Sequence, residues 1–195
     1  MFVLRKITDL AQHYLELVIN PGNRVIDATA GNGYDTEFLA RQVGPQGHVY
    51  AFDIQAEALK RTAERLRKSN LIDRVTLYET GHEEMSRLIE EPVSAVTYNL
   101  GYLPGGDHNL VTRNETTIES LSQALELLIT GGLVVITMYP GHAEGNLEKQ
   151  KLLSFCSKLQ AIEFTVVHMN LLNLLSSPPE LLIVQKNHFK QKMKA

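Results

Sequence analysis

A segment with two closely spaced glycines has the residue types of a nucleoside-binding loop. It reads Asp27-Ala28-Thr29-Ala30-Gly31-Asn32-Gly33 and lies at the end of an apolar, β-branched run. Glycine at positions 31 and 33 lets the backbone turn sharply and come close to a ligand. Twenty residues after Gly33, Asp53 ends a second apolar run, where a carboxylate accepts hydrogen bonds from ribose hydroxyls. This spacing predicts a site for a nucleoside cofactor.

The charge around the loop separates two classes of cofactor. Dinucleotide sites need a third small residue for close helix packing, and that position holds Thr36, preceded by Asp35. Asp27 and Asp35 would repel a pyrophosphate, whereas they would attract the sulfonium and amino groups of S-adenosylmethionine. We therefore expect S-adenosylmethionine as the cofactor, with NAD as the less favoured alternative.

A second set of candidates follows the apolar run 93–98. Asn99 and Tyr102 are the first and last residues of a segment that resembles the Asn-Pro-Pro-Tyr motif of exocyclic-amine methyltransferases, with Leu100-Gly101 in place of the prolines. In that motif the Asn oxygen and the next carbonyl accept hydrogen bonds from the acceptor amine, and the aromatic ring stacks on a base. The pattern predicts nitrogen as the methyl acceptor. The alternative is that Asn99 ends a strand and Tyr102 packs inside the protein.

An alkylamine acceptor must lose a proton before it reacts. Its pKa lies about 3 units above neutrality, which corresponds to roughly 4 kcal/mol at pH 7. Candidate proton acceptors are Asp107, His108 and His142. We expect Asp107 and Asn99 to orient the amine, and Tyr139 and His142 to shape the pocket.

The elements that carry these residues alternate between short β-branched runs and amphipathic segments. We expect strands at 24–28, 48–53, 75–78, 93–98, 133–139, 162–168 and 181–185, and helices at 4–19, 34–43, 55–69, 83–89, 117–129 and 147–159. Gly131-Gly132 is expected to end the helix 117–129. This alternation predicts an α/β fold with a doubly wound, mostly parallel, seven-stranded Rossmann-like sheet, whose last two strands pair antiparallel at one edge. Ligands bind at the carboxyl ends of such strands, where the candidates lie.

Composition places the chain among globular proteins. It has 195 residues, of which 44% are hydrophobic and 21% charged, and this predicts one domain over residues 1–195 with a flexible basic tail at 187–195. No apolar run is long enough to cross a bilayer and no secretory signal is recognisable, so we expect a cytoplasmic protein. A single cysteine, Cys156, can form neither an internal disulfide nor a multi-thiolate zinc site, and no metal is expected.

Four motifs in order resemble one enzyme family. The stretch 25–36 resembles the first motif of class I S-adenosylmethionine-dependent methyltransferases, with Thr29 in place of the usual first glycine. With the segments 99–107, Tyr139-Pro140-Gly141-His142 and Ser177-Pro178-Pro179-Glu180, it resembles the YtqB/MnmM family over nearly the whole chain. The resemblance implies methylation of the aminomethyl group on wobble 5-aminomethyl-2-thiouridine of tRNA, giving 5-methylaminomethyl-2-thiouridine.

The resemblance also implies which residues contact the cofactor. The set comprises Asp27, Gly31, Asn32, Gly33, Asp53, Gln55, His82 and Glu83. Asn32 and Gly33 would lie against the methionine part, Asp53 would hold the ribose, and the turn at 82–83 would contact the adenine. The alternatives are that Asp27 only organises the loop and that His82 and Glu83 cap the next helix.

An RNA partner must use a local basic patch, because the formal net charge is −3. Two basic clusters are candidates: Lys60, Arg61, Arg65, Arg67 and Lys68 in one segment, and Lys186, Lys190, Lys192 and Lys194 in the C-terminal tail. A solvated helix face explains the first cluster equally well, and a frayed terminus the second. A tRNA anticodon loop suits stacking on Tyr102 or Tyr139, with phosphate contacts from the tail or from residues 5–6.

Three further alternatives stay open at this level. These alternatives are an rRNA methyltransferase, a small-amine methyltransferase, and a non-catalytic module that binds S-adenosylmethionine and RNA. The apolar face of the N-terminal helix is explained equally well by core packing and by a homodimer surface.

Overall fold

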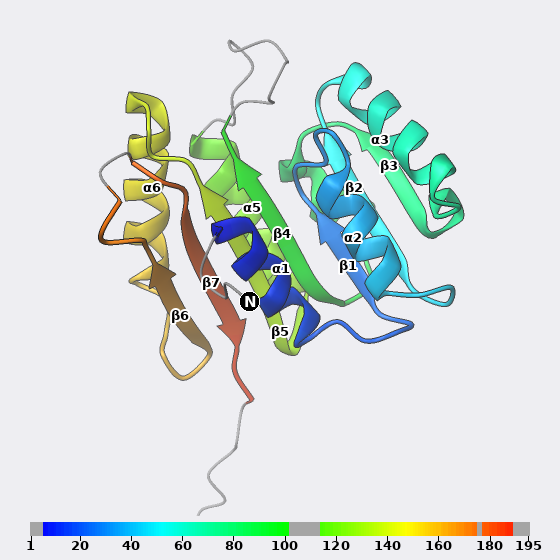
Figure 1. The fold of residues 1–195 in the computed structure, drawn as a ribbon. Helices are drawn as coiled ribbons and strands as arrows, with labels where there is room; N and C mark the ends of the chain where they lie inside the picture. The colour runs from blue at the N-terminus through cyan, green and yellow to red at the C-terminus, as the bar shows by residue number, and fades with distance from the viewer. Residues whose placement is uncertain (1–5, 102–113, 175–176, 189–195) are drawn as a thin grey trace, which may run out of the picture.

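Seven strands form one sheet at the centre of the molecule (Figure 1). The structure is a computed structural model, and it describes residues 6–101, 114–174 and 177–188. The strands are β1 (Arg24–Asp27), β2 (His48–Asp53), β3 (Val75–Glu79), β4 (Val93–Leu100), β5 (Leu128–Met138), β6 (Phe164–Met169) and β7 (Glu180–Lys186). Their order across the sheet is β3-β2-β1-β4-β5-β7-β6.

The predicted fold class is confirmed. Strands β1 to β5 pair in parallel, while β7 pairs antiparallel with both β5 and β6. The antiparallel strand is therefore β7, which lies one place in from the edge strand β6. Among its described residues, the connection from β6 to β7 contains no helix, and the chain reverses along it to add the last strand beside β5.

Helices cover both faces of the sheet. One apolar core joins α1 (Ile7–Glu16), α2 (Tyr34–Gln42) and α3 (Ala56–Lys68) to one face, and another joins α4 (Met85–Leu88), α5 (Asn114–Leu127) and α6 (Ala143–Cys156) to the other. Neighbouring residues of one strand point to opposite cores, as Val25 and Ile26 do in β1, and both are fully buried. A sheet buried on both sides explains why its strands read as continuous apolar runs.

The strand order reverses between β1 and β4. The chain moves from β1 outwards to β2 and β3, and then returns to place β4 on the other side of β1. Connections that leave neighbouring strands in opposite directions open a crevice at their carboxyl ends, and this is where ligands bind in doubly wound sheets. Asp27 ends β1 and Asn99 lies one residue before the end of β4, so the crevice separates the two groups of predicted site residues.

The expected end of helix 117–129 was wrong. Helix α5 ends at Leu127, and Gly131-Gly132 lies inside β5, which begins at Leu128. Gly131 has a φ of 83°, and the pairing register shifts between Val93 and Ala95 on β4. The glycines therefore form an irregularity in the strand, which local sequence patterns do not distinguish from a helix end. The Lys186 ammonium instead donates hydrogen bonds to two carbonyls at the end of α5, Leu125 at 3.0 Å and Glu126 at 3.1 Å, and to the carbonyl of Leu128 at the start of β5 at 2.8 Å.

Other helix boundaries also differ from the prediction; for example, α5 begins at Asn114 instead of 117, and α6 ends at Cys156 instead of 159. Helix α6 begins at Ala143, four residues earlier than expected, because His142 supplies an N-cap. Helix α1 ends at Glu16, three residues earlier than expected, and the chain then turns to bury Ile19. Of the predicted basic tail, residues 189–195 lie outside the described part. In that described part, no helix is both long and apolar enough to pass through a membrane.

Candidate cofactor and acceptor site

The glycine loop is organised from below by a buried carboxylate. Asp27 has no exposed surface, and its two oxygens accept hydrogen bonds from the Thr29 backbone N–H at 3.1 Å and the Thr36 hydroxyl at 2.6 Å. Burial, reinforced by the charge of Asp35, raises the pKa of Asp27 to about 7. In this position Asp27 shapes the loop from within instead of facing a ligand.

Gly33 is required by packing against α3. Its φ is 78°, and a Cβ built there would lie 2.8 Å from the Thr62 Oγ1 and 2.9 Å from the Thr62 Cα. The hydroxyl of Thr62 donates a hydrogen bond to the Gly31 carbonyl at 3.0 Å. The structure shows that glycine at 33 lets α3 approach the loop, and a contact between Gly33 and the cofactor stays a prediction.

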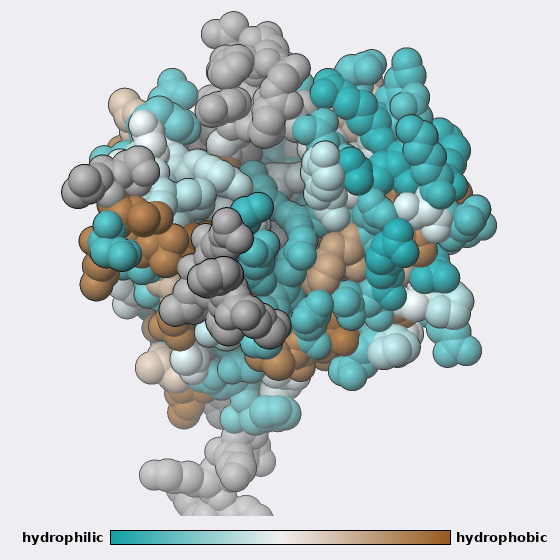
Figure 2. All heavy atoms as spheres, viewed as in Figure 1, coloured by the Kyte–Doolittle hydropathy of each residue, from teal (hydrophilic) through white to brown (hydrophobic). Residues whose placement is uncertain are grey.

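Two arginines of α3 hold the same loop from outside. The Nε of Arg65 donates to the Asn32 carbonyl at 2.9 Å, and Arg61 donates to the Asn32 side-chain oxygen at 3.3 Å. The Arg65 guanidinium also donates to Glu37 at 3.1 Å and lies over the Tyr34 ring, 3.8 Å from its centroid. Hydrophilic residues cover α3 in the surface view (Figure 2). At least these two members of the predicted RNA-binding cluster therefore have structural partners.

Asp53 connects the glycine loop to the start of α3. One of its carboxylate oxygens accepts from the Gly31 N–H at 2.8 Å and the other from the Gln55 N–H at 2.9 Å. A carboxylate oxygen has two lone pairs, so each oxygen retains capacity for a further donor such as a hydroxyl. Burial raises the pKa of Asp53, and the two backbone donors oppose that shift.

His82 and Glu83 follow β3 beside Asp53. The His82 side chain is 7% exposed, its Nδ1 lies 3.2 Å from the Glu83 carboxylate, and its ring lies against Tyr98. Because a carboxylate only accepts hydrogen bonds, Nδ1 carries the proton and Nε2 of the neutral ring is an acceptor. Among the described residues, none donates to this buried Nε2. Burial lowers the pKa of His82, so the ring is neutral at pH 7.

Asn99 lies across the crevice from this cluster. Its backbone N–H donates to the Thr29 hydroxyl at 2.7 Å, and its side-chain Nδ2 donates to Asp35 at 2.6 Å. The second oxygen of Asp35 accepts from Gln12 of α1 at 2.9 Å. Thr29, which stands where the broad class has glycine, thus ties the glycine loop to β4.

Tyr139 borders the same part of the crevice. It directly follows β5 and is 36% exposed, and its ring packs near Gly101, where a Cβ would lie 3.7 Å from the ring. Burial and the negative charge of Asp35 raise the pKa of the Tyr139 hydroxyl. The phenol therefore stays protonated at neutral pH.

His142 has a structural partner that the sequence did not predict. Its Nδ1 accepts a hydrogen bond from the Gly145 N–H at 3.0 Å and so caps α6. In the neutral ring the proton is then on Nε2. This geometry argues against His142 as a proton acceptor, because accepting a proton at Nδ1 would break the cap. Tyr102, Asp107 and His108 lie outside the described residues.

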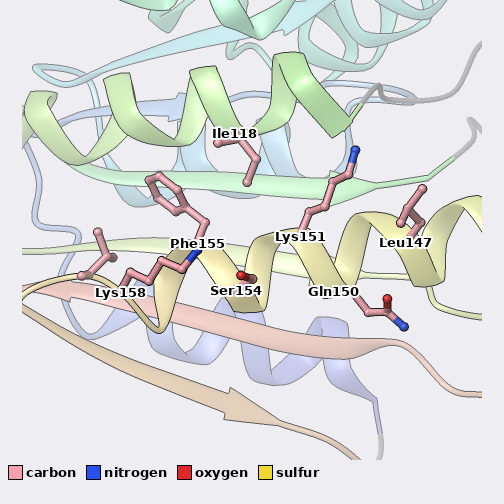
Figure 3. Close-up of a pocket in the computed structure, with 8 residues that line it drawn as sticks. Ile118, Leu147, Gln150, Lys151, Ser154, Phe155 and Lys158 are labelled. Atoms are coloured by element: carbon pink, nitrogen blue, oxygen red, sulfur yellow. The ribbon is translucent and has the colours of Figure 1, made fainter.

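A shallow groove of about 570 Å³ lies elsewhere, between α5 and α6 (Figure 3). Phe155 of α6 points towards α5, where Ile118 lies, and Lys151 and Lys158 border the groove. None of the predicted site residues lines it. The groove is therefore separate from the crevice at the carboxyl ends of β1 and β4.

The chain is similar to known methyltransferases. A family model described as "Putative rRNA methylase" matches residues 49–185, more than half of the chain. The chain belongs to this family. Its membership makes the chain a methyltransferase, as the motifs predicted. A second model, described as protein-L-isoaspartate(D-aspartate) O-methyltransferase, matches residues 5–84, which include the glycine loop.

Three relatives of the methylase family illustrate the match. An Arabidopsis thaliana protein named tRNA (mnm(5)s(2)U34)-methyltransferase, chloroplastic, is 36% identical over 89% of this chain and 67% of its own length. A crystal structure of a "putative rRNA-methylase" from Clostridium thermocellum is 43% identical, with a TM-score of 0.93, and the match covers 95% of this chain and 100% of that one. A "putative methyltransferase" from Streptococcus mutans, solved with SAH, is 34% identical, with a TM-score of 0.86 and coverage of 94% and 99%.

Several contacts of this methylase site have no clear signal in the sequence. Gln12 lies on a helix whose pattern indicates only an apolar face, and Thr62 and Arg65 lie on a helix that reads as a solvated basic face. Asp35 was visible as an acid beside the glycine loop, but its bond to Asn99 joins residues 64 positions apart. Only the pairing of β1 with β4 brings those residues together.

Proposed function

We propose that this S-adenosylmethionine-dependent methyltransferase methylates the primary amine of wobble 5-aminomethyl-2-thiouridine in tRNA, giving 5-methylaminomethyl-2-thiouridine. The observation that carries the proposal is the Asn99 side chain, whose Nδ2 is bound to Asp35 while its oxygen has no donor among the described residues. An amide oxygen at the end of β4, across from a nucleoside-binding loop, accepts an N–H of an amine and thereby directs the nitrogen lone pair.

The residues of the crevice fit S-adenosylmethionine. The buried Nε2 of His82 is an acceptor without a donor in the described part of the chain, and the adenine amino group supplies one. Asp53 retains lone pairs for the ribose hydroxyls, and the nearby carboxylate of Asp35 favours a cation over a pyrophosphate. When bound, S-adenosylmethionine supplies a methyl group on a positively charged sulfur, which an uncharged amine can attack.

The protein's own contribution to the reaction is mainly positioning. Asn99 orients the amine, Tyr139 limits the space around it, and partial desolvation in the crevice lowers the pKa of an ammonium group. Asp107 stays a proposed partner of the ammonium form, and Tyr102 a proposed stacking platform for the base. His142 is less suited to proton transfer because its Nδ1 caps α6.

The choice of tRNA rests on the relative from Arabidopsis thaliana, whose name specifies U34 of tRNA, the wobble position. An anticodon loop presents unstacked bases, which suits an open crevice with an aromatic side chain at its border. The family description names rRNA instead, so rRNA is the second candidate acceptor. The cytoplasmic location, the single-domain organisation and the homodimer stay predictions.

The experiment compares acceptors with one enzyme preparation. Purified protein and labelled S-adenosylmethionine are incubated with tRNA carrying 5-aminomethyl-2-thiouridine, with the same tRNA carrying unmodified uridine, with rRNA, and with small alkylamines. We expect label only in the first tRNA, and nucleoside mass spectrometry should identify the methylaminomethyl product. Methylation of rRNA or of a small amine at a comparable rate would contradict the proposal.

Two variants assign the reaction to this crevice. Asn99→Ala should lower kcat/KM by about 100-fold while leaving the affinity for S-adenosylhomocysteine within about 3-fold. Asp73→Asn, an exposed change at the opposite end of β3, should behave as wild type. Equal activity of Asn99→Ala and wild type would remove Asn99 from the proposed mechanism.

A further inference from the structure

A chain of three polar side chains crosses from α1 to β4. Gln12 donates to one oxygen of Asp35 at 2.9 Å, and Asn99 donates to the other at 2.6 Å. Asp35 lies in the first turn of α2, directly after the glycine loop, and is partly buried. Each residue thus comes from a different element that meets the same crevice.

The chemistry of the central residue determines the orientation of Asn99. A carboxylate accepts hydrogen bonds and cannot donate, so Asn99 must turn its NH₂ towards Asp35. The side-chain oxygen of Asn99 then points away from Asp35, and among the described residues it has no donor. An Asn99 side chain without this partner could present either its NH₂ or its oxygen to an incoming amine, and only the oxygen accepts an N–H.

A general stabilising role of an acid at a helix N-terminus does not account for this geometry. Glu37 also lies in the first turn of α2, and it pairs with Arg41 and Arg65 on the outside of the molecule. Asp35 instead uses both oxygens on residues 23 and 64 positions away. Its charge also reaches the crevice, since it raises the pKa of Tyr139.

We propose that Asp35 is a positioning residue for methyl transfer, which holds the Asn99 amide with its oxygen towards the acceptor amine, and that Gln12 holds Asp35 in turn. The inference rests on the proposed function only in taking an amine as the group that Asn99 receives. It makes α1 a part of the site, because Gln12 lies on that helix.

A double-mutant cycle separates action through Asn99 from other roles of Asp35. We expect Asp35→Asn to lower kcat/KM for tRNA by about 10- to 100-fold, because an Asn side chain has one acceptor oxygen for two donors. In the Asn99→Ala background the same change should cost less than about 3-fold. Equal losses in both backgrounds, or no loss in the wild-type background, would overturn the inference.

Controls separate a local effect from unfolding. Asp73→Asn removes one exposed negative charge at the distant end of β3 and should leave kcat/KM unchanged. Affinity for S-adenosylhomocysteine, which lacks the sulfonium charge, should stay within about 3-fold of wild type in Asp35→Asn. A large loss of that affinity would assign Asp35 to the cofactor loop and refute its role at Asn99.

A second readout does not depend on which substrate the enzyme uses. The NMR signals of the Asn99 side-chain NH₂ group can be assigned by their loss in Asn99→Ala. The hydrogens of this group should exchange slowly with water in the wild type and at least about 10-fold faster in Asp35→Asn. Unchanged exchange would overturn the inference whatever the methylation assays give. If the wild type methylated none of the acceptors, the proposed function would fail, and this measurement would still decide whether Asp35 holds Asn99.

Discussion

Replacement of Gly33 by alanine tests how the glycine loop is packed. The residue has a φ of 78°, and an added Cβ would approach both the side chain and the backbone of Thr62, at 2.8 to 3.0 Å. Because one of these atoms is the Thr62 Cα, a rotamer change alone cannot remove the clash. The substitution should therefore push α3 away from the loop.

Two costs combine in this variant. A non-glycine residue with left-handed backbone geometry costs about 1 to 2 kcal/mol. Overpacking against a close backbone costs about 1 to 3 kcal/mol more. We expect Gly33→Ala to lower the free energy of unfolding by about 2 to 5 kcal/mol. Displacement of α3 would also disturb the hydrogen bond from Thr62 to Gly31 and the neighbouring bond from Gly31 to Asp53.

Gly22 provides a matched control within the same chain. Its φ is 90°, and a Cβ there would meet no atom within 4 Å. Gly22→Ala therefore isolates the backbone cost, and it should lower the unfolding free energy by about 1 to 2 kcal/mol. The difference between the two variants measures the contact with Thr62.

The assay is equilibrium urea unfolding of both variants and the wild type, followed by calorimetric titration with S-adenosylhomocysteine. Gly33→Ala should bind at least about 10-fold more weakly, and Gly22→Ala should bind as wild type does. Equal losses of stability in the two variants, with unchanged binding, would refute the assignment of Gly33 to helix packing.

Three further predictions follow from individual side chains. Burial raises the pKa of Asp27 from 3.8 to about 7, so the folded state binds more protons than the unfolded state between these pH values. Raising the pH from 5 to 8 should therefore lower the free energy of unfolding of the wild type by about 3 kcal/mol relative to that of Asp27→Asn, and urea unfolding of both proteins at both pH values checks this. Lys186→Met removes the donor to carbonyls at the end of α5 and at the start of β5, and it should lower the free energy of unfolding by about 1 to 2 kcal/mol, which a lower melting temperature reports. Its affinity for S-adenosylhomocysteine should stay unchanged, and a loss of that affinity would contradict the prediction. Arg65→Met removes a donor to Asn32 and should weaken calorimetric binding of S-adenosylhomocysteine by about 10-fold, whereas exposed Arg67→Met should not.

Much of the fold follows from the order of apolar runs along the chain. The inner residues of strands such as 24–27 and 48–53 are buried, so these strands read as short apolar runs, and their alternation with amphipathic helices predicts a parallel sheet. The glycine loop and Asp53 were also predictable, because each directly follows a strand at a spacing that reflects one β-α-β unit. Local patterns were weaker at Gly131-Gly132, where the same residues suit a helix end and a strand irregularity.

The sequence by itself thus determined the class of sheet, the position of the cofactor loop and the residues that follow each strand. Only the tertiary structure decided which of those residues touch: Asp35 meets Asn99 and Gln12, Arg65 meets Asn32, and His142 turns to its own helix. The physical reason is that periodicity reports burial within one element. Contacts between side chains on different elements depend on strand order and register, which bring distant positions together.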